Sequence, residues 1–186
     1  DGRTTKLVEW TTISDAPELK DTGDAAQDAI RAIVPTGVPW YLAEEPGLGM
    51  GISFDDPIKA QKTWGNFGRA VELGPAEEAR YKKIVSIYTC DYCCGGPNAV
   101  TTINRCGCAH AYAWKGVAKF FLKYYPEKFT DEEIIGEMTR WKALFYPKGM
   151  IQNFLVYTGK SDVSILNQGG VVGIRQQFAG QSGSAQ

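Results

Sequence analysis

The sequence predicts a mostly α-helical fold: a small helical domain with a knuckle and β-hairpin element that binds metal, and extended arms at both ends. Apolar residues recur at helical spacing, and prolines and capping residues bound each such segment. All five cysteines and the only histidine lie in one stretch, CDYCCGGPNAVTTINRCGCAH. We therefore divide the 186 residues into an N-terminal arm (1–22), a helical metal-binding domain (23–157) and a C-terminal arm rich in glycine and glutamine (158–186).

An arm and a capped helix open the chain. Residues 1–22 mix charges with the strand-like piece LVEWTTI, which predicts an extended arm or an edge strand. A helix is expected between Asp24, a residue type that caps helix N-termini, and Pro35, which ends it. Its apolar positions fall on one face: Ala26, Ile30 and Ile33.

A loop and two further helices are expected before the cysteines. The loop after Pro35 is rich in glycine and proline, and its aromatic residues indicate that it is held against the core: Trp40, Tyr41 and Phe54. Pro57 opens a short helix through Trp64, and Pro75 opens a longer one. The longer helix has one apolar stripe: Tyr81, Ile84, Val85 and Tyr88.

Three more helices are expected after the cysteines. AHAYAWKGVAKFFLKYYP has one apolar face, and its lysines Lys115, Lys119 and Lys123 are expected to form a solvated face. The next helix begins at a capping box formed by Thr130 and Glu133. Its core positions recur at helical spacing: Ile134, Met138, Trp141 and Phe145. Pro147 starts a last helix with four apolar positions: Met150, Ile151, Phe154 and Leu155.

The cysteine stretch has the spacing of a metal site. The motif C-x-x-C-C-G-G is followed by C-G-C-x-H, with eleven residues between Cys94 and Cys106. The first half resembles a zinc knuckle, NAVTTINR predicts a β-hairpin or strand and turn, and the second half falls at the start of a helix. A knuckle, a hairpin and ligands at a helix N-terminus form treble-clef metal sites, and the helix dipole stabilises thiolates there. The candidate ligands are Cys90, Cys93, Cys94, Cys106, Cys108 and His110.

Six candidate ligands exceed the four that a tetrahedral zinc ion takes. We predict zinc as the metal, held by Cys90, Cys93, Cys106 and Cys108. Cys94 and His110 are alternates. Adjacent cysteines such as Cys93 and Cys94 rarely both face one ion. The surplus also leaves room for an iron–sulfur cluster, which takes four cysteines, or for Cu(I), which prefers thiolates.

Other interpretations of these residues remain open. Disulfides would leave one of the five cysteines over, and they would tie together only a local loop. His110 shares a face with Ala113 and Val117, so that it is alternatively a hydrogen-bonded core residue. A catalytic cysteine with His110 as its base is a third interpretation, although neighbouring thiols would expose such a nucleophile to oxidation.

Five segments resemble an uncharacterised family of prokaryotic proteins whose members are often exported or membrane-anchored: GVPWY, GISFDDP, CDYCCGG, CGCAHAYAWKG and TDEEIIGEMTRWKALFYPKGMI. The resemblance covers about Val38 to Phe154, and the cysteine and histidine pattern is its most specific part. It implies no activity. It implies an extracytoplasmic or envelope-associated location and a processed N-terminus, and the absence of a methionine at Asp1 fits either processing or a shortened sequence.

Composition and the absence of known motifs exclude several classes of function. A net charge of −1 argues against a nucleic-acid binder, and no apolar run is long enough for a membrane span. No P-loop, G-x-G-x-x-G, H-E-x-x-H or G-x-S-x-G motif occurs, and we assign no catalytic residue. We expect a non-enzymatic metal-binding subunit whose arms contact protein partners or other copies. The alternatives are a redox or metal-handling protein with an iron–sulfur cluster or copper, and a disulfide-stapled exported protein without metal.

Overall fold

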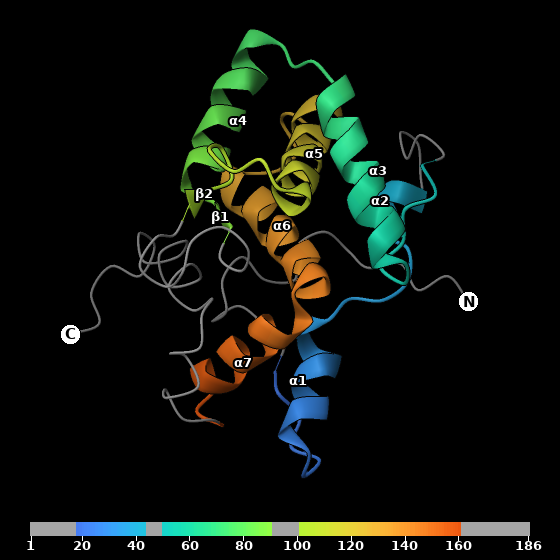
Figure 1. Ribbon diagram of the computed structural model, residues 1–186, viewed down its shortest axis with the longest axis vertical. Coiled ribbons are helices and arrows are strands. Elements are labelled where there is room, and N and C mark those ends of the chain that lie inside the picture. The colour runs from blue at the N-terminus through green and yellow to red at the C-terminus, as the bar shows by residue number, and fades with distance from the viewer. Residues whose placement is uncertain (1–17, 44–49, 91–100, 161–186) are drawn as a thin grey trace, which may run out of the picture.

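Seven helices and two short strands make up the residues that the computed structural model describes, 18–43, 50–90 and 101–160 (Figure 1). The helices are α1 (Ala25–Ile33), α2 (Trp40–Ala43), α3 (Pro57–Ala70), α4 (Pro75–Ile87), α5 (Ala109–Tyr124), α6 (Asp131–Phe145) and α7 (Pro147–Tyr157). The strands are β1 (Thr89–Cys90) and β2 (Thr101–Thr102), which pair antiparallel. The prediction of a mostly helical fold with a small β-hairpin is confirmed.

Local capping chemistry sets the helix boundaries. Asp24 and Asp56 cap α1 and α3, because each carboxylate accepts a hydrogen bond of 3.0 Å from the backbone N–H three residues later. The predicted capping box of α6 is confirmed: Glu133 N–H donates to Thr130 Oγ1 at 3.1 Å, and Thr130 N–H donates to Glu133 Oε2 at 2.8 Å. Prolines stand at the first position of three helices: Pro57, Pro75 and Pro147.

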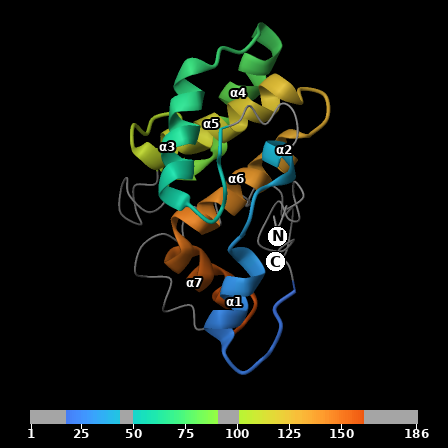
Figure 2. The same ribbon diagram turned by 90° about the vertical axis from the view of Figure 1, so that its right-hand side faces the viewer.

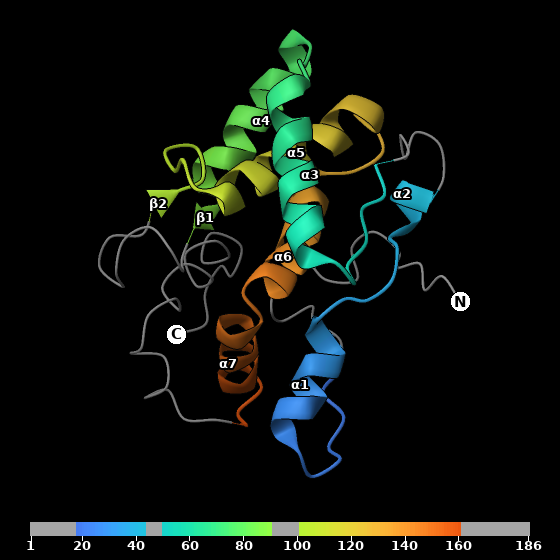
Figure 3. The same cartoon turned by 45° about the vertical axis from the view of Figure 1, so that its right-hand side comes forward.

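Glycines allow α3 and α5 to pack in close contact, side by side in Figures 1 and 3. A β-carbon on Gly68 would lie 2.8 Å from the α-carbon of Gly116, and one on Gly116 would overlap the backbone oxygen of Trp64. The expected end of this helix near Trp64 is wrong, because α3 continues to Ala70. Gly65 and Gly68, in the part of α3 beyond Trp64, face α5.

Aromatic rings fill the core between α3, α5 and α6. The ring of Trp64 meets that of Trp141 edge-on, with the ring centroids 5.7 Å apart. The ring centroid of Phe54 lies 4.2 Å from that of Trp141. Tyr41 packs 4.7 Å from Phe121 on α5. The loop that carries Tyr41 and Phe54 is therefore held against the core, as predicted, although the sequence did not predict the short helix α2 within it.

α1 and α7 lie side by side at one end of the molecule, apart from the main core (Figures 1 and 2). Together with Ala143 of α6 they form a second hydrophobic cluster, to which they contribute Ala29, Ile33, Met150 and Phe154. The face expected for α1 is only partly correct, since Ala26 is exposed while Asp28 is buried. Asp28 is tolerated there because its carboxylate accepts hydrogen bonds from Thr22 N–H and Thr22 Oγ1, at 2.8 and 2.7 Å.

α6 is buried on all sides from Ile134 to Ala143 instead of having the single apolar stripe that its sequence suggested. Glu137, Arg140 and Lys142 are 0, 2 and 0% exposed. Arg140 pairs with Glu137 at 3.2 Å, and the Tyr41 hydroxyl donates to Glu137 Oε1 at 2.6 Å. Trp141 Nε1 in turn donates to the Tyr41 hydroxyl at 2.9 Å. These partners satisfy charges that would otherwise be costly to bury.

The lysine row of α5 is solvated only at its end. Lys119 Nζ donates to the carbonyl oxygens of Gly68 and Val71, both at 2.8 Å, so that it caps the C-terminus of α3. Lys115 is half-buried and donates to the Cys106 carbonyl at 3.1 Å, whereas Lys123 is exposed. The expectation of a solvated face is therefore wrong for Lys115 and Lys119, because neighbouring segments present carbonyl groups to them.

Several predictions fall outside the described residues. Most of both predicted arms (1–22 and 158–186) and the knuckle with Cys93 and Cys94 lie there, and the domain boundaries stay a prediction. Within the described residues, no helix combines the length and apolar character that a membrane span requires.

Candidate metal centre

The short hairpin places Cys90 beside the segment that carries Cys106 and Cys108. α4 ends at Ile87, and β1 pairs with β2 so that Cys90 lies opposite Thr101. The chain then turns back, since Ile103 N–H donates to the Tyr88 carbonyl at 2.8 Å and Asn104 N–H donates to the Val85 carbonyl at 3.1 Å. The predicted strand and turn in NAVTTINR thus contains β2, and its partner β1 ends at the first cysteine, Cys90.

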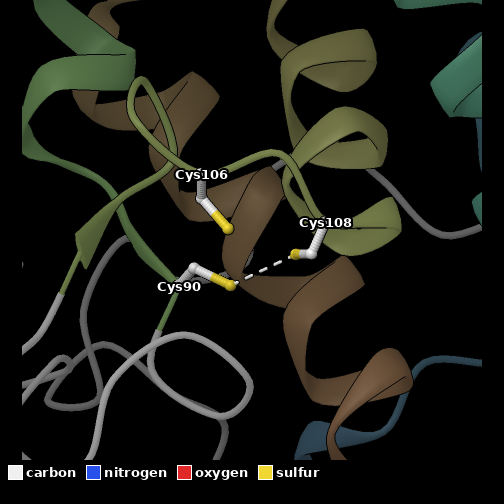
Figure 4. Close-up of side chains that lie close together, drawn as sticks. All are labelled: Cys90, Cys106 and Cys108. Atoms are coloured by element: carbon white, nitrogen blue, oxygen red, sulfur yellow. Dashed lines mark hydrogen bonds between the residues drawn. The ribbon is translucent and has the colours of Figure 1, made fainter.

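Three cysteine sulfurs converge where β1, the loop after β2 and the start of α5 meet (Figure 4). The Sγ atoms of Cys90, Cys106 and Cys108 all lie within 4.8 Å of one another, and Cys90 Sγ is 3.5 Å from Cys108 Sγ. We call these residues the three-cysteine cluster. It is close enough to hold a metal ion, and each sulfur comes from a different local segment.

The sulfur spacing fits a single tetrahedral ion. Four thiolates at about 2.3 Å from zinc lie about 3.8 Å from one another. The 3.5 Å between Cys90 and Cys108 is near that value, and it is far longer than the ~2.05 Å bond of a disulfide. The cluster therefore has the donor atoms and the spacing that a thiolate-bound ion needs.

Cys108 occupies a distinct position in the cluster, because it is the N-cap of α5. Its sulfur accepts a hydrogen bond of 3.3 Å from Ala111 N–H, and the helix dipole favours negative charge there. It is half-buried, whereas Cys90 and Cys106 are 0 and 4% exposed. The sequence predicted this placement at the start of a helix, with Cys106 just before it.

Two lysines bring positive charge near the cluster. Lys115 donates to the Cys106 carbonyl at 3.1 Å. Burial lowers the pKa of Lys115, while charge on Cys106 and Cys108 acts in the opposite direction and favours the ammonium form. Lys142 is fully buried and donates to the Thr89 carbonyl, next to Cys90, at 3.1 Å. No sequence pattern pointed to Lys142, because the apolar stripe expected for α6 did not include this residue.

His110 lies among aromatic side chains. Its Nδ1 is 2.7 Å from the Tyr146 hydroxyl, and its ring lies 4.4 Å from that of Tyr146 and 6.1 Å from that of Trp114. Burial lowers the pKa of His110, so that the neutral ring is favoured. Among the described residues His110 is not part of the metal-sized group, and its role as an alternate ligand stays a prediction, as do the roles of Cys93 and Cys94.

No protein-family model, curated protein or solved structure matches this chain. The functional argument therefore starts from the site itself, and the resemblance based on the cysteine motif stays a prediction.

Proposed function

We propose that this protein binds one zinc ion, for a structural purpose, with Cys90, Cys106 and Cys108 as three of its ligands. The convergence of three sulfurs within 4.8 Å of one another carries this proposal. Cys93, which the C-x-x-C spacing pairs with Cys90, is the proposed fourth ligand, and Cys94 and His110 are the alternates. The ion would join the end of β1, the loop before α5 and the N-terminus of α5.

The spacing favours one ion over an iron–sulfur cluster. In clusters with four cysteine ligands each iron takes at most two protein thiolates, so three cysteines divide between at least two irons. The cluster's own atoms then separate some of the cysteine sulfurs. Here all three sulfurs are mutual neighbours, as expected when they share one ion.

The second candidate is a copper-handling protein. Cu(I) is a soft ion that prefers thiolates, and a cluster of three thiols offers it a complete set of sulfur donors. The half-buried Cys108 would provide the side from which an acceptor protein takes the ion. Copper and zinc are distinguished by which ion the purified protein retains.

Elemental analysis, together with competition titration of zinc affinity, tests this proposal. Protein purified without chelator should hold about one zinc per chain, and Cys90→Ser, Cys106→Ser and Cys108→Ser should each weaken zinc affinity by at least tenfold. Ser86→Ala, at an exposed position of α4, is the control and should retain full zinc. Copper as the retained ion would favour the second candidate, and no metal together with unchanged affinity in the serine variants would overturn both.

We further propose that the protein is a non-enzymatic subunit of an extracytoplasmic or envelope-associated assembly. The motif resemblance and the polar composition of the predicted C-terminal arm support this. Light scattering on native material, with cell fractionation, tests it. An assembly in the envelope fraction is the expected result, and a monomer in the cytoplasmic fraction would contradict it.

A further inference from the structure

We propose that Cys108 is the oxidation-sensitive ligand of the three-cysteine cluster, and that its disulfide with Cys90 releases the metal. This inference rests on the proposed function, because it describes how the same site is regulated. It makes the cluster a two-state device, with an ion in one state and a disulfide in the other.

Among the three cysteines that the structure describes, exposure selects Cys108 as the one that an oxidant reaches first. Cys90 and Cys106 are 0 and 4% exposed, whereas Cys108 is half-buried. Small oxidants react with thiolates that they can approach, so reaction is faster at the accessible sulfur. Cys108 also stands at the N-terminus of α5, where the Ala111 N–H points at its sulfur from 3.3 Å.

Cys90 is near enough to Cys108 to be its disulfide partner. Its Sγ lies 3.5 Å from Cys108 Sγ, so the two sulfurs need to approach by about 1.5 Å to reach the bond length of a disulfide. Cys90 ends the two-residue strand β1, at the edge of the small hairpin. Burial protects Cys90 from direct oxidation but leaves it in contact with the sulfur that oxidation modifies (Figure 4).

The chemistry balances with hydrogen peroxide as the oxidant. The Cys108 sulfur attacks one peroxide oxygen, the O–O bond breaks, and a sulfenic acid and hydroxide form. The Cys90 sulfur then attacks the Cys108 sulfur and displaces hydroxide. Two thiols lose two electrons, and peroxide, with two protons, becomes two waters. Cys90 and Cys108 would then no longer serve as thiolate ligands, and an ion held by the cluster would dissociate because the remaining donors are too few.

Peroxide titration of the zinc-loaded full chain tests this. A zinc-sensitive dye follows release, dimedone traps sulfenic acid, and mass spectrometry of alkylated peptides locates the first disulfide. We expect dimedone on Cys108, a first bond between Cys90 and Cys108, and about one zinc released per peroxide consumed. A first bond that excludes Cys108, or sulfenic acid on another cysteine, would overturn the inference.

Cysteine variants and a parallel experiment on the metal-free protein complete the test. Cys108→Ser should slow peroxide-driven thiol loss by about tenfold or more, whereas Cys106→Ser should leave the Cys90–Cys108 bond forming. If a serine variant does not fold, dimedone trapping on the unmodified chain still decides. If the chain holds no zinc, the proposed function fails, while the disulfide map of the metal-free protein still tests the pairing on its own.

Discussion

Gly68 of α3 faces Gly116 of α5 so closely that a β-carbon on Gly68 would lie 2.8 Å from the Gly116 α-carbon. Backbone meets backbone at this point, and neither helix has a flexible side chain that can move aside. Because Cys108 is the N-cap of α5, this contact also fixes the helix that positions one of the three cysteines of the cluster.

We predict that Gly68→Ala and Gly116→Ala each destabilise the fold by about 2 kcal/mol or more, because the added methyl group forces the helices apart. Gly65→Ala is the matched control on α3, since its β-carbon would make ordinary contacts of 3.6 Å and longer. That change should be neutral or stabilising, because alanine favours a helix by about 1 kcal/mol. Urea unfolding of the three variants gives the comparison, and equal effects at positions 65 and 68 would contradict it.

The sequence predicted the structure best where contacts between residues close together in the chain determine it. Thr130 and Glu133 form the capping box because both partners lie within one turn. Cys106 and Cys108 fall at the start of α5 for the same local reason. The direction of His110 is different, since Tyr146, 36 residues away, accepts or donates its hydrogen bond. No periodicity within one helix contains that information.

Tertiary contacts also decided which polar residues are buried. Glu137 and Lys142 look like surface residues of an amphipathic helix, yet both are fully buried. Their partners are Tyr41 of α2 and the Thr89 carbonyl of β1, both far away in the sequence. A pattern search along α6 alone could not find them, because long-range partners make their burial tolerable.

Tyr41→Phe tests the buried network. The change removes the hydroxyl that donates to Glu137 at 2.6 Å and accepts from Trp141 at 2.9 Å, so it leaves two buried groups without this partner. We expect a loss of about 1–3 kcal/mol in the free energy of unfolding, measured with urea. Tyr157→Phe is the control, because Tyr157 is 59% exposed and should change stability little. Similar effects of the two variants would show that the network contributes nothing measurable.

The ion pairs of Asp131 should make the stability of the fold decrease at acid pH. Burial by itself would raise the pKa of Asp131, but hydrogen bonds and charges from Lys83 and Arg80 outweigh it and hold the pKa below its usual value of 3.8. Its contribution is therefore fully present above pH 3.8 and is lost as pH falls through the lower folded-state value.

We expect Asp131→Asn to be less stable than the parent chain at pH 7, and the difference to shrink toward zero in strong acid. Chemical unfolding at a series of pH values measures the difference. Glu132→Gln, at an exposed neighbouring position of α6, serves as the control and should show little change. A difference that stays constant down to the lowest pH would assign the effect of Asp131 to something other than its charge.

Zinc removal should loosen the hairpin and the first turn of α5 and leave the far end of the molecule unchanged. The proposed ion joins only local segments, whereas the α1–α7 contact has its own hydrophobic cluster. Hydrogen exchange with and without chelator measures this. We expect faster exchange at β1, β2 and the N-terminus of α5, and unchanged exchange in α1 and α7. Uniformly faster exchange would instead indicate that the ion stabilises the whole domain.

Lys142 connects the core helix α6 to the metal centre, since its ammonium donates at 3.1 Å to the carbonyl of Thr89, the neighbour of Cys90. It also lies over the rings of Tyr88 and Trp114, at 4.9 and 5.6 Å from their centroids. Lys142→Met preserves the length of the side chain and removes the charge and the donor. The Thr89 carbonyl then loses this partner in a buried position, and the strand that presents Cys90 becomes less rigid.

We therefore expect Lys142→Met to weaken zinc affinity by about tenfold, as is usual when a group that orients a ligand is removed. The change should also lower the free energy of unfolding of the metal-free chain by about 1–3 kcal/mol. Zinc competition titration measures the first effect and urea unfolding the second. Lys123→Met, at an exposed position of α5, is the control for loss of one positive charge. Lower stability with unchanged zinc affinity would show that Lys142 supports the core without positioning Cys90, because the two measurements separate those roles.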